Sequence, residues 1–143
     1  QFAIHAKTLP GKPYDGHTLE TVLPDIEALT GAGIKRVLAD AGYKGHNAPL
    51  AHKFHVFTTG QKRGVADKIK RQMKRRAAVE PVIGHIKNEH RMNRCWLAHS
   101  HGDATNAILA AAGYNFTLIL KWIKALWLIF CWALFSSVQA KSA

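Results

Sequence analysis

The stretch IKRVLADAGYKG, residues 34 to 45, decides the fold class. Its first half, Ile34 to Ala39, is a short run rich in aliphatic residues that ends directly before Asp40. Short aliphatic runs bounded by glycine predict a strand. The segment from Ala41 to Gly45 contains two glycines and predicts a turn. The stretch therefore predicts an acidic side chain at the end of a strand.

Two more strands and one helix are predicted around this stretch. Phe2 to Leu9 alternates apolar and polar residues, and His55 to Thr59 (HVFTT) is β-branched and aromatic, so both segments predict strands. Leu19 to Thr30 repeats apolar residues at helical spacing, and we expect Thr18 to cap it. Strands that alternate with helices predict an α/β sheet, whose ligands gather beyond the carboxyl ends of the strands, where Asp40 would lie.

The charge of the chain predicts a polyanionic partner. Its 143 residues contain 20 Lys and Arg against 9 Asp and Glu, a formal net charge of +11, and Gln61 to Arg76 is the most basic stretch. Basic side chains neutralise phosphates and release counterions, although an ordinary solvated face has the same composition. The side chains that we expect to contact DNA from this stretch are Lys68, Lys70, Arg71, Lys74, Arg75 and Arg76.

The residues that follow predict an amphipathic helix with an acid at its start. Pro81 lacks an N–H and fits only the first turn, so the helix is expected to begin near Ala78 and to carry Glu80 in that turn; a kink at Pro81 is the alternative. Helical spacing places Arg76, Lys87 and Arg91 on the side of Glu80, as further DNA contacts. The basic residues at 76 and 87 either position a phosphate or simply pair with the acid.

Asp40 and Glu80 are the acids best placed to bind a metal. Phosphoryl transfer on nucleic acids uses carboxylates from distant parts of a chain to hold two Mg²⁺ ions, which prefer hard oxygen ligands. The alternatives are a turn acid at Asp40 and a first-turn helix acid at Glu80. Nine histidines and two cysteines show no spacing typical of zinc ligands, and the cysteines fit a reducing cytoplasm.

Four ordered motifs give the chain a resemblance to a known family. They are PYDGHTL (13 to 19), ADAGYKG (39 to 45), RRAAVEPVIGHIKNEHRMNR (75 to 94) and GDATNAILAAAGYN (102 to 115). Together they resemble the C-terminal part of a bacterial insertion-sequence transposase of the DDE type. Arg76, Glu80 and Lys87 match the family's spacing around its catalytic Glu, while Met73 stands where the family usually has Tyr.

The resemblance implies a partial RNase H-like fold that lacks its first strands, with Asp40 as the second catalytic acid and Glu80 as the third. It implies Mg²⁺-dependent cleavage and strand transfer at element ends, with DNA and another transposase chain as partners, in a bacterial cytoplasm near the nucleoid. The family's first Asp would lie ahead of Gln1, so we expect an upstream portion and little cleavage by this chain alone. The alternative is a non-catalytic DNA-binding fragment that modulates a full-length transposase.

The last third of the chain is apolar with few interruptions. We expect a partial catalytic domain over residues 1–106 and an apolar helical segment over 107–143 that packs on it. A bilayer span needs about 20 apolar residues, and the stretch from Trp122 to Phe135 is shorter, so no membrane partner is expected. A basic protein anchored at a membrane surface by its Trp-rich tail is the third interpretation.

Overall fold

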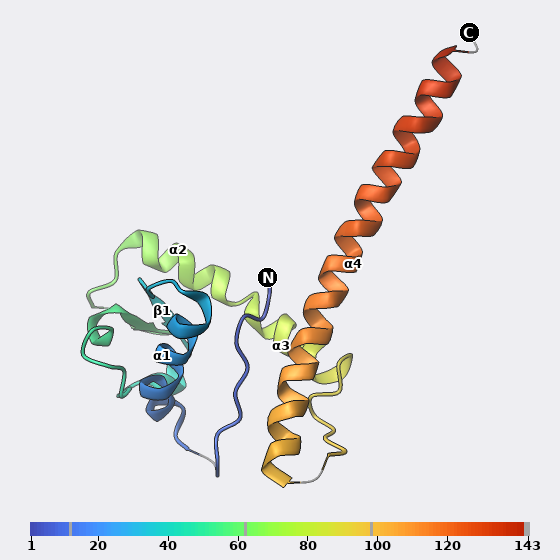
Figure 1. Ribbon diagram of the computed structural model, residues 1–143. Coiled ribbons are helices and arrows are strands. Elements are labelled where there is room, and N and C mark those ends of the chain that lie inside the picture. The colour runs from blue at the N-terminus through green and yellow to red at the C-terminus, as the bar shows by residue number, and fades with distance from the viewer. Residues whose placement is uncertain (12, 62, 98, 142–143) are drawn as a thin grey trace.

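The protein is an elongated molecule with a small α/β body and one long helix (Figure 1). The computed structural model describes residues 1–11, 13–61, 63–97 and 99–141, with side chains placed as far as residue 136. The elements in chain order are η1 (Asp15–Thr18), α1 (Leu19–Thr30), β1 (Val37–Ala39), η2 (Ala41–Tyr43), η3 (Lys53–His55), β2 (Val56–Thr58), α2 (Asp67–Arg76), α3 (Val79–Asn88) and α4 (His99–Lys141).

The two strands form a parallel sheet. Val37 lies opposite Val56 and Ala39 opposite Thr58, so the carboxyl ends of β1 and β2 meet at one edge. Thr59 extends the pairing, because its N–H and its hydroxyl both donate to the Ala39 carbonyl at 3.1 and 3.3 Å. Both strands lie inside the stretches predicted from sequence, which confirms an α/β arrangement with a sheet smaller than expected.

Helix α1 supplies most of the core beside this sheet. Leu19 and Leu23, one helical turn apart, are buried against Ala39 and Val56. The helix ends where predicted, since Gly31 has a φ of 64° and donates its N–H to the Glu27 carbonyl at 2.9 Å. The N-terminal cap predicted at Thr18 is wrong.

Thr18 occupies the N-cap position of α1 without capping it. Its backbone is helical, with φ −94° and ψ −19°, because the short helix η1 runs directly into α1. The Thr18 hydroxyl therefore donates back to the Asp15 carbonyl at 2.7 Å instead of accepting from the first turn of α1.

The expected strand at Phe2 to Leu9 is also wrong, because this segment contains no described strand. Its backbone pairs with a side chain of α4. The Ala3 N–H donates to Oδ1 of Asn115 at 2.9 Å, and Nδ2 of Asn115 donates to the Ala3 carbonyl at 2.7 Å. Phe2 packs edge-on against Trp122, with ring centroids 5.3 Å apart. The segment whose apolar and polar residues alternate therefore docks on α4 instead of joining the sheet.

A second core joins α3 to the first half of α4. Ile86 is buried against Ala110 and Tyr114. The ring of His90 lies edge-on to Tyr114, with ring centroids 6.1 Å apart. Gly113 permits this packing, because a Cβ there would lie 2.9 Å from Nδ1 of His90. Helix α3 thereby connects the sheet-containing body to α4 (Figure 1).

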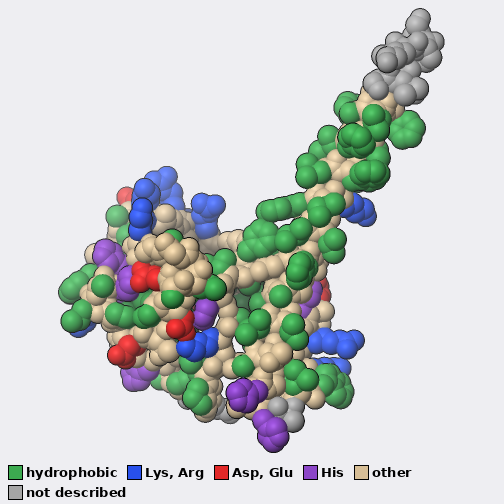
Figure 2. Space-filling model, in the orientation of Figure 1, with side chains coloured by type: hydrophobic (Ala, Val, Ile, Leu, Met, Phe, Trp, Pro, Cys, Tyr) green, Lys and Arg blue, Asp and Glu red, His purple; other side chains and the backbone are tan. Residues whose placement is uncertain are grey.

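The predicted C-terminal helix is present, but its packing differs from the expectation. Helix α4 continues unbroken through residue 107, and beyond Trp122 it projects away from the body (Figures 1 and 2). Leu126, Trp127, Phe130 and Trp132 are all more than half exposed. The described body offers this part of the helix no surface to cover it.

Helix α4 is also long and apolar enough over His99–Ser136 to cross a membrane, by length and composition alone. None of its most apolar 18-residue window is buried. This part of α4 is therefore an uncovered apolar surface.

Candidate functional site

Asp40 lies at the carboxyl-terminal edge of the sheet, as the sequence predicted. It follows β1 directly, and its Oδ1 accepts the Ala41 N–H at 2.6 Å, which caps the short helix η2. The carboxylate therefore acts as a turn acid, one of the two roles considered for it. Its other oxygen, Oδ2, faces a guanidinium, and 55% of the side chain is exposed.

Arg76 brings the two predicted acids to one place. Its Nη2 lies 3.4 Å from Oδ2 of Asp40, and its Nη1 lies 3.9 Å from Oε1 of Glu80. The Arg76 side chain is only 17% exposed, whereas that of Glu80 is 70% exposed. A largely buried guanidinium thus holds two accessible carboxylates from different elements, which is the central geometric feature of this site.

A break between two helices produces this arrangement. Helix α2 ends at Arg76, the N–H of Ala78 donates to the Arg75 carbonyl at 3.1 Å, and α3 begins at Val79. The proline at position 81 falls in the first turn of α3, where its missing N–H costs no helical hydrogen bond. The expected start of this helix and the position of Glu80 in its first turn are both confirmed.

The expectation that one helix carries Arg76, Lys87 and Arg91 on the side of Glu80 is wrong for two of these residues. Arg76 belongs to the preceding helix, and Arg91 lies beyond the end of α3 at Asn88, with a left-handed φ of 58°. Lys87 is on α3 and exposed, seven residues after Glu80 and therefore on the same face. The helix is too short to carry all of these side chains on one side.

A pocket of about 420 Å³ opens beside the two helices. Arg76, Glu80, Lys70 and Met73 line one wall, and the chain from Phe57 to Gln61, which includes the end of β2, lines another. The pocket therefore lies at the edge where the parallel strands end, the place at which α/β sheets bind ligands. Thr59 and Gln61 were not singled out from the sequence, although their position directly after a strand could have indicated them.

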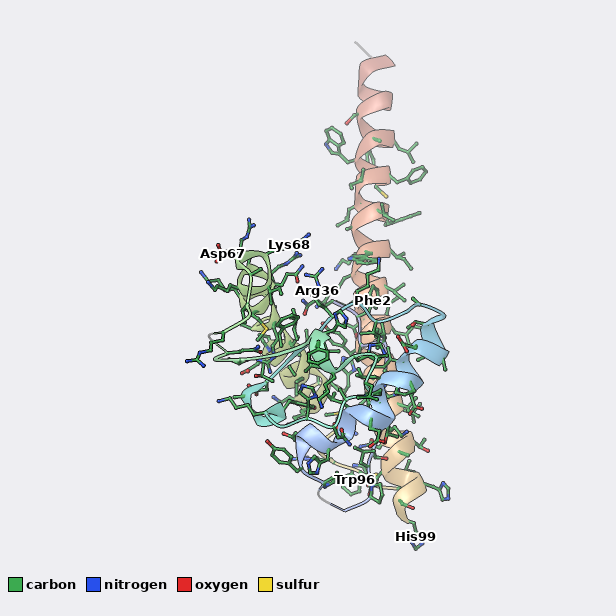
Figure 3. The ribbon with its side chains drawn as sticks, turned by 90° about the vertical axis from the view of Figure 1, so that its left-hand side faces the viewer. Phe2, Arg36, Asp67, Lys68, Trp96 and His99 are labelled. Atoms are coloured by element: carbon green, nitrogen blue, oxygen red, sulfur yellow. The ribbon has the colours of Figure 1, made fainter. Side chains whose placement is uncertain are left out.

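The predicted basic side chains cover the exposed surface of α2. Lys70 forms an ion pair of 2.9 Å with Asp67, three residues away. Asp67 and Lys68 mark the start of the helix in Figure 3, and the basic patch at that end of the body is visible in Figure 2. The exposed members of the set are Lys68, Lys70, Arg71, Lys74 and Arg75.

The donor set at Asp40 and Glu80 fits Mg²⁺ held together with a phosphate. Magnesium is usually bound through one or two carboxylates, several waters and substrate phosphates. Within the described ranges no group of three or more His, Cys, Asp or Glu side chains gathers at one point. Asp40 and Glu80 supply two carboxylates, the number and type of protein ligand that Mg²⁺ commonly uses.

Three comparisons with known proteins gave no match: family models, curated proteins and solved structures. By its fold the chain is a mainly helical α/β protein with a small parallel sheet. Its site consists of two acids that both form ion pairs with Arg76, beside the basic helix α2.

Proposed function

We propose that the chain is part of a DDE transposase with an RNase H-like fold, which binds insertion-sequence DNA and takes part in Mg²⁺-dependent cleavage and strand transfer. The observation that carries the proposal is the convergence of Asp40 and Glu80 on Arg76 beside the basic helix α2. Residues 40 and 80 are distant in the sequence, and the sequence predicts both as metal-binding acids. The four ordered motifs, two of which contain these residues, add support.

The chain's own residues have separate roles in this proposal. The exposed lysines and arginines of α2 bind the DNA backbone and hold it over the adjoining pocket. Asp40 and Glu80 supply carboxylate oxygens, and Arg76 orients both and neutralises part of their repulsion. Bound Mg²⁺ would supply the Lewis acidity that phosphodiester cleavage requires.

A test measures how much Mg²⁺ strengthens DNA binding. We expect Mg²⁺ to raise the affinity of the full chain for a labelled duplex in fluorescence anisotropy at constant ionic strength, because Mg²⁺ held by Asp40 and Glu80 would offset their negative charge beside a DNA phosphate. Asp40→Asn and Glu80→Gln should each remove most of this gain, while raising metal-free affinity slightly by removing a negative charge. Mn²⁺ should act in the same way.

Asp67→Asn is the matched control. Asp67 is also an exposed acid beside the basic residues of α2, but it pairs with Lys70 and lies at the opposite end of that helix from Arg76. The Mg²⁺ gain should survive this substitution. An equal loss in all three variants would assign the effect to general electrostatics and contradict a metal role for the acids at 40 and 80.

A non-catalytic DNA-binding role is the second candidate function. It is favoured by the basic surface of α2, which can bind phosphates without any metal. In this case the chain would occupy element ends, or join a full-length transposase, without cutting DNA. Strong salt-dependent binding with no gain from Mg²⁺ in the experiment above would select this function over the first.

A further inference from the structure

A second pocket lies at the other end of α3, in the connection to α4. Its volume is about 440 Å³, within the range of roughly 300–1,000 Å³ typical of ligand sites. It is lined by two arginines, two asparagines and a tryptophan: Asn88, Arg91, Asn93, Arg94 and Trp96. This combination provides cationic, amide and aromatic groups in one place.

The side chains of this pocket are available to a ligand. Trp96 is 82% exposed, and Figure 3 shows it near the start of α4, close to His99. In the part of the chain that the structure describes, neither Arg91 nor Arg94 has a carboxylate within ion-pair distance. The neighbouring acid Glu89 instead pairs with His85.

The backbone under these side chains is held in place on both sides. Arg91 has a φ of 58°, and its carbonyl accepts the Arg94 N–H at 3.0 Å. Asn106 of α4 donates from Nδ2 to the Met92 carbonyl at 3.2 Å. Gly102 lets the connection approach α4, since a Cβ there would lie 2.7 Å from the Leu97 carbonyl carbon. The exposed side chains therefore project from a fixed loop.

We propose that this pocket binds an unpaired nucleotide of DNA, with Trp96 stacked on its base and Arg91 and Arg94 on its phosphates. An exposed indole stacks on any base, and guanidinium groups bind phosphate oxygens through paired N–H donors. Asn88 and Asn93 offer amides to the edge of the base. A duplex keeps its bases stacked inside, so the ligand is a single-stranded end or an unstacked position.

Each of the two pockets has a lining residue on α3. Glu80 and Asn88 are eight residues apart on α3, which is about 12 Å along the helix axis at ~1.5 Å per residue. One strand of duplex DNA advances about 3.4 Å per nucleotide. A DNA strand that reaches both pockets would therefore have to extend over at least a few nucleotides along α3. This inference rests on the proposed DNA-binding function.

The test compares an overhang with a blunt end. The probes are a blunt duplex, the same duplex with a five-nucleotide single-stranded overhang containing 2-aminopurine, and one whose overhang is abasic. The wild-type chain should bind the overhang more tightly than the blunt duplex and should quench 2-aminopurine. Trp96→Ala should weaken overhang binding roughly tenfold, abolish the quenching and leave blunt binding unchanged. Trp96→Phe should retain most of both effects.

Trp132→Ala is the matched control, because Trp132 is 72% exposed and lies 33 residues after His99 on α4, which is about 50 Å along the helix axis at ~1.5 Å per residue. It should change neither affinity nor quenching. Abasic and normal overhangs that bind equally well would show a simple anion site and overturn the proposal. If the chain binds the blunt duplex but shows no Trp96-dependent preference for the overhang, this inference is overturned while the proposed function stands. Failure to bind any of the probes would instead overturn the proposed function.

Discussion

Arg76 links the two acids of the site, because it forms ion pairs with both Asp40 and Glu80. The Arg76 side chain is only 17% exposed, and the carboxylates that balance its charge are those of Asp40 and Glu80. The sequence indicated an i, i+4 pair with Glu80 from spacing. It gave no indication of the contact with Asp40, because that contact depends on how α2 packs against β1. A long-range ion pair of this kind has no periodic signal.

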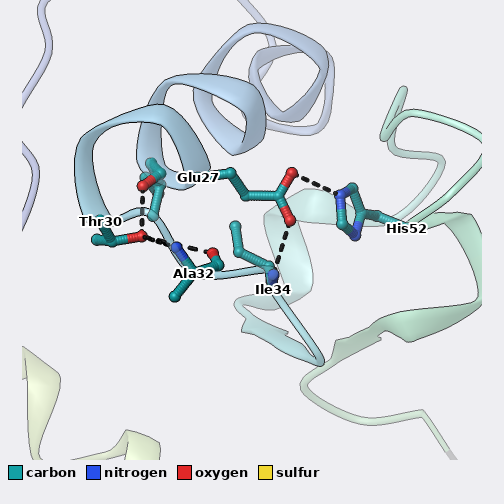
Figure 4. Close-up of polar contacts among 6 residues, drawn as sticks. Glu27, Thr30, Ala32, Ile34 and His52 are labelled. Carbon is teal, nitrogen blue, oxygen red and sulfur yellow. Dashed lines mark hydrogen bonds and ion pairs between the residues drawn. The ribbon is translucent and has the colours of Figure 1, made fainter.

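Glu27 is the acid with the clearest structural role away from the site (Figure 4). Its Oε1 accepts the Ile34 N–H at 2.7 Å, and its Oε2 lies 3.3 Å from Nε2 of His52. The hydrogen bond from Ile34 lowers the pKa of Glu27 below its ordinary 4.5, with a smaller contribution from His52. The charged form is therefore stabilised by folding, and the carboxylate ties the end of α1 to the segment before β1.

Glu27→Gln should lower stability at neutral pH but not in acid. Because the folded pKa lies below 4.5, the stabilisation is complete above that pH and is lost as the pH falls through the lowered folded value. We expect the urea midpoint of the variant to be below that of the wild type at about pH 7 and to converge with it as the pH falls through the lowered folded pKa of Glu27. Equal losses at both pH values would assign the effect to packing.

Among the helices and strands, those that depend on local sequence patterns were predicted correctly. The helix at Leu19–Thr30, the two strands at residues 37–39 and 56–58 and the start of α3 follow from apolar spacing, glycine and proline, all of which act within a few residues. The segment at Phe2 to Leu9 was predicted wrongly, because alternation is the same for a strand and for a chain docked on a helix. Only Asn115, 112 residues after Ala3, distinguishes the two.

Asn115→Ala should release this N-terminal segment. The substitution removes both hydrogen bonds to Ala3, each worth about 0.5–1.5 kcal/mol. We expect faster amide exchange for residues 2–9, measured by mass spectrometry, with little change in α1 and the sheet. Asn106→Ala is the control on the same helix, and it should speed exchange around Met92 instead. Unchanged exchange at residues 2–9 would show that Phe2 and Trp122 suffice to hold the segment.

At the scale of the molecule, the outer half of α4 is the least covered surface. Its apolar side chains from Leu126 to Phe130 are exposed at consecutive positions, whereas single proteins in solution seldom expose such a large contiguous apolar area. Composition predicted an apolar helix there but could not show whether the rest of the chain would cover it. That depends on the shape and size of the body, which the sequence pattern does not specify.

This surface should make the isolated chain self-associate. Replacing Ile123, Trp127 and Phe130 with Gln should raise the dissociation constant of the associated species at least tenfold, because burying each large apolar side chain contributes roughly 1.5–3 kcal/mol. Size-exclusion chromatography with light scattering measures the change. Lys121→Gln with Lys124→Gln controls for new glutamines on the same helix, and an equal shift in both variants would contradict an apolar cause.

The parallel pairing of β1 and β2 has a kinetic consequence for the site. Parallel neighbours cannot form by a tight hairpin, so the chain from Asp40 to His55 must close as a loop before the strands gain their hydrogen bonds. Helices α2 and α3 need only local contacts and assemble earlier. Asp40 therefore reaches Arg76 late in folding, after Arg76 and Glu80 are already neighbours.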